Sequence, residues 1–115
     1  MSLLHISQVG NNIPITVFQI RERVTLENFA ELEKITKDTY DSGMRSLVVD
    51  LSQIPALSSI GVRAIVVIHK IVSAGNRNAL KVACAQPLIR DVLQISGLTQ
   101  FIELYDTMDE AAASF

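Results

Sequence analysis

The amino-acid sequence predicts a single α/β domain, with a mixed, mostly parallel β-sheet and helices packed against it. The chain has 115 residues, which is enough for one domain to bury a core without disulfides or metals. Hydrophobic residues make up 49% of it and charged residues 19%, a balance that excludes an intrinsically disordered chain. From Ile13 onward, short strand-like runs alternate with helical patterns, and such alternation is typical of parallel strands joined by helices.

The first elements are expected to be a β-hairpin and a helix. Residues 3–7 and 13–20 are short apolar runs, and residues 9–12 between them read Val-Gly-Asn-Asn, which tolerates the positive φ of a tight reversal. Thr25 is predicted to cap the helix, because its hydroxyl can accept a backbone N–H of the first turn. This helix is expected to end before Gly43.

A central strand and a second helix follow. Residues 45–51 have the continuous β-branched and leucine character of a strand that is covered on both faces. Residues 52–57 are expected to form a loop, and Ser58 and Ser59 introduce a helix over residues 60–74. Projected at about 100° per residue, the side of this helix that faces the sheet is expected to hold Gly61, Ile65, Ile68 and Val72.

The next pair of elements is another strand and helix. Residues 79–85 form an apolar run, in which Cys84 is predicted to be a buried small hydrophobe. Pro87 suits the first turn of a helix, because its missing N–H would be unpaired there, and Gly97 ends that helix. Its apolar side is expected to hold Leu88, Ile89, Val92, Leu93 and Ile95.

The last two elements are expected to be short. Residues 101–104 form an apolar run that predicts a strand. Residues 107–110 read Thr-Met-Asp-Glu, a capping box, which predicts a helix over residues 111–115.

Composition and spacing exclude several classes of protein. A net charge of -2 with scattered cations gives no footprint for nucleic acid. The longest apolar run, residues 64–68, is far below the about 20 residues that span a bilayer, and the first residues do not resemble a signal peptide, so a cytoplasmic protein is expected. Cys84 is the single cysteine, and His5 and His69 are not spaced as metal ligands, so neither a metal nor a cofactor is expected.

Function is expected in the loop that leaves the central strand, since ligands of parallel sheets bind beyond the carboxyl ends of the strands. Asp50 ends that strand and is expected either to receive hydrogen bonds that shape the loop or to cap a turn. Ser58 and Ser59 open the helix, where the dipole would favour a phosphate by about 0.3–1 kcal/mol. The alternative is that one serine is only an N-cap, worth about 1 kcal/mol.

Two blocks of the sequence resemble a known family. In the first, residues 50–52 read Asp-Leu-Ser and are followed by six loop residues, then by Ser59 and Gly61 at the start of an apolar helix. In the second, residues 96–98 read Ser-Gly-Leu and lead to a strand and a final helix that contains residues 110–111, Glu-Ala. In order and spacing, both blocks resemble the STAS domain of bacterial anti-sigma-factor antagonists, over almost the whole of residues 1–115.

The resemblance implies a non-enzymatic switch. In the family, a loop that reads Asp-Ser-Ser-Gly or Asp-Ser-Thr-Gly is phosphorylated on its first serine by an anti-sigma factor that is also a serine kinase. Aligning the glycine on Gly61 puts this phosphoacceptor at Ser59, with Ser58 in place of the aspartate and Ile60 before the glycine. The unphosphorylated chain would bind the kinase and release a sigma factor, and phosphate would break the complex. The implied switch loop comprises Asp50, Ser52, Ser58 and Gly61.

The outer face of the helix over residues 60–74 is too apolar for a purely solvated surface. It fits a partner-binding patch for the anti-sigma factor, and it equally fits burial against a neighbouring helix or the mate of a homodimer. The residues predicted to bind the partner are Ile60, Arg63, Val66, Val67 and Lys70.

Two alternative functions stay open. One is a STAS docking subunit of a stressosome-like or lipid-transport ATPase assembly, which would bind its partner constitutively. The other is a small enzyme, against which the sequence offers no Gly-x-Ser-x-Gly motif and no histidine placed to activate Ser59.

Overall fold

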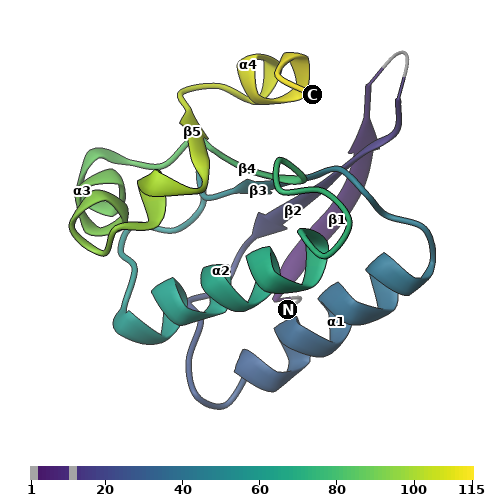
Figure 1. The fold of residues 1–115 in the computed structure, drawn as a ribbon. Helices are drawn as coiled ribbons and strands as arrows, with labels where there is room; N and C mark the ends of the chain where they lie inside the picture. Colours follow the sequence, from purple (N-terminus) through teal and green to yellow (C-terminus); the bar gives the residue numbers. More distant parts are fainter. Residues whose placement is uncertain (1–2, 11–12) are drawn as a thin grey trace.

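The computed structural model describes residues 3–10 and 13–115, and within them five strands form one sheet in the order β1-β2-β3-β4-β5 (Figure 1). The strands are β1 (Leu4–Val9), β2 (Ile15–Ile20), β3 (Leu47–Asp50), β4 (Leu80–Ala83) and β5 (Glu103–Tyr105). β1 pairs with β2 antiparallel, and the other three pairs are parallel. The predicted mixed, mostly parallel sheet with a central third strand is confirmed.

The helices lie on both faces of the sheet. They are α1 (Phe29–Asp41), α2 (Ser59–Val72), α3 (Pro87–Ile95) and α4 (Met108–Ala113), with a short 3-10 turn, η1 (Leu98–Gln100). In Figure 1, α1 and α2 lie side by side across one face, α4 lies across the other, and α3 stands beside β4 and β5. Within the described ranges, no helix has the length and apolar character needed to cross a membrane.

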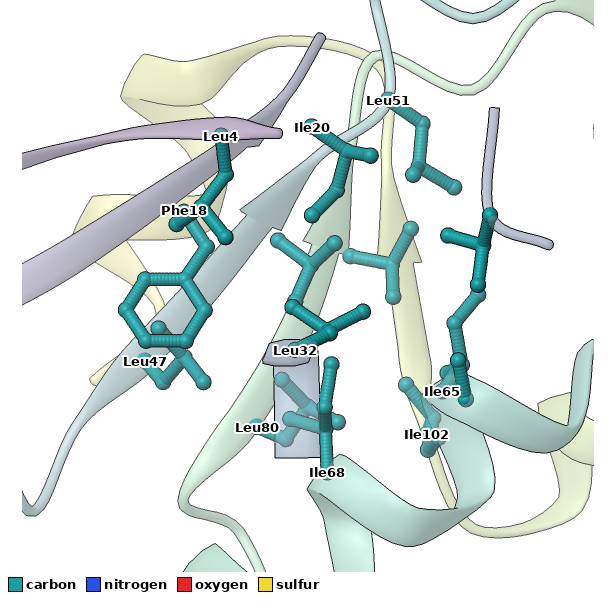
Figure 2. Packing of buried hydrophobic residues seen from close by; sticks show 14 of the residues in the cluster. Leu4, Phe18, Ile20, Leu32, Leu47, Leu51, Ile65, Ile68, Leu80 and Ile102 are labelled. Atoms are coloured by element: carbon teal, nitrogen blue, oxygen red, sulfur yellow. The ribbon is translucent and has the colours of Figure 1, made fainter. Parts of the chain in front are cut away.

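The main core lies between the sheet and the pair α1–α2. Figure 2 shows Phe18 of β2 and Leu47 of β3 on the same side of the sheet as Leu32 of α1. Ile65 and Ile68 of α2 are buried in the same cluster, as the helical spacing predicted. Since alternate residues of a strand point to opposite faces, each central strand contributes half of its side chains to this layer.

The face covered by α4 holds a smaller core and a buried cation. Its buried apolar residues are Ile15, Val48, Ala83 and Ala111. Next to them, the side chain of Lys81 is only 4% exposed, and its Nζ forms an ion pair with Glu103. Lys81 Nζ also lies 5.5 Å from the centre of the Phe115 ring, so the end of the chain covers this cation.

The predicted hairpin is confirmed, with the register running from Leu4 opposite Ile20 to Val9 opposite Ile15. Gly10 has φ +111, and a Cβ there would lie 2.4 Å from the carbonyl oxygen of Ile13, so the turn requires glycine at this position. The predicted turn also includes Asn11 and Asn12, which lie outside the described residues.

The predicted cap of the first helix is wrong. α1 begins at Phe29 with Asn28 at the N-cap position, and Thr25 lies in a turn before it. Asn28 Oδ1 accepts the backbone N–H of Thr25 at 2.8 Å, and Asn28 Nδ2 donates to the Arg23 carbonyl at 2.9 Å. The Asn28 amide thus closes a turn ahead of the helix, and its side chain makes no hydrogen bond to the N–H groups of the first helical turn. The end before Gly43 (φ +118) is confirmed.

In the second half of the chain, β4 is shorter than predicted, and α3 buries fewer of its apolar residues than predicted. β4 ends at Ala83, because Cys84 adopts φ +62, a left-handed conformation that stops the strand and leaves the thiol half-buried. Cys84 is therefore not the buried strand residue that was predicted. α3 begins and ends as predicted, but it contacts the body through one narrow stripe, so Leu88 and Ile95 are 72% and 87% exposed.

The last strand and helix are shifted from their predicted bounds. Phe101 precedes β5, and its ring packs against His69 with 4.9 Å between ring centres. Thr107 Oγ1 accepts the backbone N–H of Glu110 at 3.1 Å, which confirms the cap. The helix therefore begins at Met108, directly after its capping residue.

Two isoleucines in helices offer a matched test of this packing. Ile68 is 1% exposed in the main core, so Ile68→Ala should lower the free energy of unfolding by about 2–5 kcal/mol. Ile95 is 87% exposed, so Ile95→Ala should change it by less than about 0.5 kcal/mol. Urea unfolding followed by circular dichroism measures both, and equal losses would contradict the assignment of α2 to the core.

Candidate functional site

Asp50 shapes the loop at the carboxyl end of β3. The residue is 6% exposed, and its Oδ1 accepts the backbone N–H of Ser52 at 2.8 Å. Its Oδ2 accepts a hydrogen bond from Gln19 Nε2 at 3.3 Å. Asp50 therefore has both of the roles that the sequence left open, because it receives hydrogen bonds that shape the loop and it also caps a turn. One carboxylate oxygen closes a turn and the other is held by β2, so the chain leaves the sheet in one direction.

The rest of this loop is anchored to the body of the protein. Leu51 and Ile54 are 1% and 3% exposed and belong to the main core. The Ile54 carbonyl accepts a hydrogen bond from Gln86 Nε2 at 3.3 Å, which ties the loop to the start of α3. Gln86 was not singled out from the sequence, because a partner 32 residues away leaves no local pattern. The loop therefore presents the start of α2 from a fixed position.

Ser58 is the N-cap of α2. It has extended backbone, and its Oγ accepts the backbone N–H of Gly61 at 3.3 Å. The same hydroxyl donates to the Val24 carbonyl at 3.5 Å, so it both accepts and donates a hydrogen bond. The N-cap that the sequence offered as an alternative is therefore Ser58, because α2 begins at Ser59 and the Ser58 oxygen accepts an N–H of the first turn.

Ser59 is the first residue of α2, and it is exposed. Within the described part of the chain, its hydroxyl has no side-chain hydrogen bond of the kind that holds Ser58. The first turn of α2 carries no acidic residue, so the positive end of the helix dipole beside Ser59 is not offset. The site therefore combines an accessible hydroxyl with a local environment that favours an anion.

Gly61 allows the loop to pack closely over the first turn of α2. A Cβ at this buried position would lie 2.5 Å from Leu57 Cδ1 and 3.1 Å from Leu57 Cγ. Leu57 is half-buried against the main core and closes the loop over the helix. The glycine of the predicted switch loop thus has a steric role, and Leu57 is a residue that the sequence did not reveal.

The residues predicted for partner binding fall into two groups. Arg63 and Lys70 are exposed, whereas Ile60 and Val66 are half-buried against the main core. Val67 is also half-buried, and it lines a narrow space together with Phe29 and Leu32 of α1. For this residue, burial against a neighbouring helix is the alternative that the structure supports. The exposed strip of α2 is accordingly narrower than expected and more basic.

Two other titratable side chains, His69 and Cys84, are half-buried, and burial shifts the pKa of each. Burial lowers the pKa of His69, whose ring lies against Phe101, so the imidazole is neutral at pH 7. Burial raises the pKa of the Cys84 thiol, and the nearby Asp50 carboxylate adds to the effect. The thiol is thus protonated at neutral pH and a poor nucleophile. In the described ranges, no three His, Cys, Asp or Glu residues gather as metal ligands would.

Comparison with known proteins agrees with this geometry. The chain matches the STAS domain family over residues 7–111, and it belongs to that family. It is 28% identical over 92 residues to BtrV of Bordetella bronchiseptica, described as a candidate anti-sigma factor antagonist, covering 80% of this chain and 78% of that protein.

Solved structures share the fold. A candidate anti-sigma factor antagonist from Thermotoga maritima superposes with a TM-score of 0.85 at 20% identity, covering 96% of this chain and 92% of the other. The antagonist SpoIIAA in its unphosphorylated form gives a TM-score of 0.74 at 16% identity, with coverage of 94% and 91%. SpoIIAA of Bacillus in the phosphorylated form gives 0.71 at 14% identity, with coverage of 96% and 97%.

The different environments of the two serines predict different effects on stability. Ser58→Ala removes the N-cap and should lower the free energy of unfolding by about 0.5–2 kcal/mol. Ser59→Ala, one residue further at an exposed position, should change it by less than about 0.5 kcal/mol. Chemical denaturation of both variants measures the two changes in the free energy of unfolding. A larger loss for Ser59→Ala would mean that Ser59 is the capping residue.

Proposed function

We propose that this chain is an anti-sigma-factor antagonist that works as a phosphorylation-controlled binding switch, with Ser59 as the phosphoacceptor. The observation that carries the proposal is the exposed hydroxyl of Ser59 at the uncompensated positive end of α2. Membership of the STAS family and relatives described as anti-sigma factor antagonists support it. The partner would be an anti-sigma factor that is also a serine kinase.

The exposed strip of α2 is the surface proposed to bind this partner. The helix carries no Asp or Glu, and its exposed cations are Arg63 and Lys70. Val66 lies between them on the same side, half-buried, and adds an apolar contact. A surface of this kind fits a partner patch with an apolar centre and acidic rim, since complementary charge speeds and orients association.

Phosphorylation would neutralise the positive charge of that strip. A phosphate brings about -1.5 to -2 charges, which offsets the two cations Arg63 and Lys70. Ser59 and Arg63 are four residues apart on one helix, so the phosphate and the guanidinium are neighbours on its surface. An ion pair between them would remove Arg63 from the partner and put a negative group against its acidic rim. Both effects would release the partner.

The serine next to it is a poorer acceptor. The Ser58 hydroxyl is half-buried and bonded to both Gly61 and Val24, so a kinase would have to break the start of α2 to reach it. The proposal therefore assigns capping to Ser58 and modification to Ser59.

Phosphopeptide mapping tests the assignment. The partner is first retrieved from the native cell by affinity purification with this chain, and the pair is then incubated with ATP. Phosphate is expected on Ser59 and absent from Ser58. Phosphate on Ser58 alone would contradict the assignment, and phosphate on neither serine would favour constitutive docking.

Binding variants test the switch itself. Ser59→Ala should bind the partner and stay bound in the presence of ATP, whereas Ser59→Asp should bind at least about tenfold more weakly, a loss of about 1.4 kcal/mol. Ser58→Ala is the matched control and should still be released by ATP. Titration calorimetry measures all three, and equal affinities of Ser59→Ala and Ser59→Asp would argue against an electrostatic switch.

The basic strip makes a separate prediction. Arg63→Glu and Lys70→Glu should each lower the affinity for the partner about tenfold or more, and this loss of affinity should be smaller at high salt. Arg77→Glu is the control, because Arg77 is an exposed cation in the loop after α2 and outside this strip. The same affinity for all three variants would contradict the assignment of the partner surface to α2.

A further inference from the structure

β1 is an edge strand whose outer side has open hydrogen-bonding groups. The Leu3 carbonyl accepts the backbone N–H of Arg21, which sets the alternation of the β1–β2 ladder. It follows that Leu4, Ile6 and Gln8 direct their backbone N–H and C=O groups away from β2. Across residues 3–10 and 13–115, no segment pairs with that side of β1.

This edge lacks the usual protection against pairing with another chain. Natural edge strands are blocked by charged residues, proline, bulges or short length. β1 has six residues, Leu-His-Ile-Ser-Gln-Val, with no Lys, Arg, Asp, Glu or Pro among them. Ile6 and Val9 are 45% and 41% exposed along it. The opposite edge, β5, has three residues and carries the exposed Glu103, so it is protected in the usual way.

We infer that β1 binds β1 of a second copy of this chain, antiparallel, about a two-fold axis at Ile6. In that register Ile6 lies opposite Ile6 of the partner subunit, and Leu4 lies opposite Gln8 of the partner subunit. Leu4, Ile6 and Gln8 are the residues with outward backbone groups, so every opposed pair can exchange two hydrogen bonds. Pairing about any odd residue would instead oppose groups already used by β2.

The occupant is a second copy because the edge is complementary to itself. The only apolar side chain at its centre, Ile6, meets its own equivalent, as an isologous interface requires. The strand has no Asp, Glu, Lys or Arg that would select a different sequence. None of its residues belongs to the Ser59 site or to the strip of α2, so the dimer does not depend on the proposed function.

Disulfide trapping tests the register. In a Cys84→Ser background, Ile6→Cys places two thiols opposite each other with Cα atoms about 5.5 Å apart, within the range for a disulfide of about 4.4–6.8 Å. Gln8→Cys in the same background is the control, because its two copies would sit about 13 Å apart along the strands. Ile6→Cys should form covalent dimers under mild oxidation at least about tenfold faster than Gln8→Cys. Equal rates would overturn the register.

Sedimentation tests the interface in the unmodified chain. The weight-average mass should rise with concentration from 12.6 kDa towards twice that value. Ile6→Lys sets two cations opposite each other and should abolish the rise, whereas Ile13→Lys should keep it, because Ile13 is equally exposed, 44%, but lies outside the paired edge. A wild-type chain that stays monomeric to about 1 mM, or that pairs only with foreign peptides, would overturn the proposal.

Discussion

Burial of β3 on both faces is the constraint on which the rest of the structure depends. Leu47, Val48 and Val49 are 0% exposed and Asp50 is 6% exposed. A strand covered in this way needs a neighbouring strand on each side and helices above and below, which β2, β4, α1–α2 and α4 supply. The one polar side chain in it must find its hydrogen bonds in place. Asp50 does so through Gln19 and the next turn, and this determines where the following loop leads.

The start of α2 places a serine with a structural role next to an exposed one. Ser58 is held by two hydrogen bonds, and Gly61 lets Leu57 pack over the first turn. These contacts hold the backbone still around Ser59, whose own side chain takes no part in them. The proposed switch requires this separation, because a phosphate on a capping or core group would disrupt the fold as well as the binding.

The amino-acid sequence by itself determined the elements whose causes are local. The run over residues 45–51 indicated a strand buried on both faces, and the 3.6-residue spacing of Ile65, Ile68 and Val72 identified the inner side of α2. The cap at Thr107 was likewise visible, because its partner is three residues away. The sequence also indicated that a loop follows Asp50, whereas Gly61 was assigned to the switch loop through the family resemblance. Short-range patterns of this kind survive in any tertiary context that buries the apolar side.

Only the tertiary structure decided which of several equivalent groups takes each role. Ser58 rather than Ser59 caps α2, because the hydroxyl of Ser58 also reaches Val24, a residue 34 positions away in sequence. Val67 lies against α1 for the same kind of reason. Such choices depend on atoms brought together from distant segments, and periodicity carries no information about which segments meet.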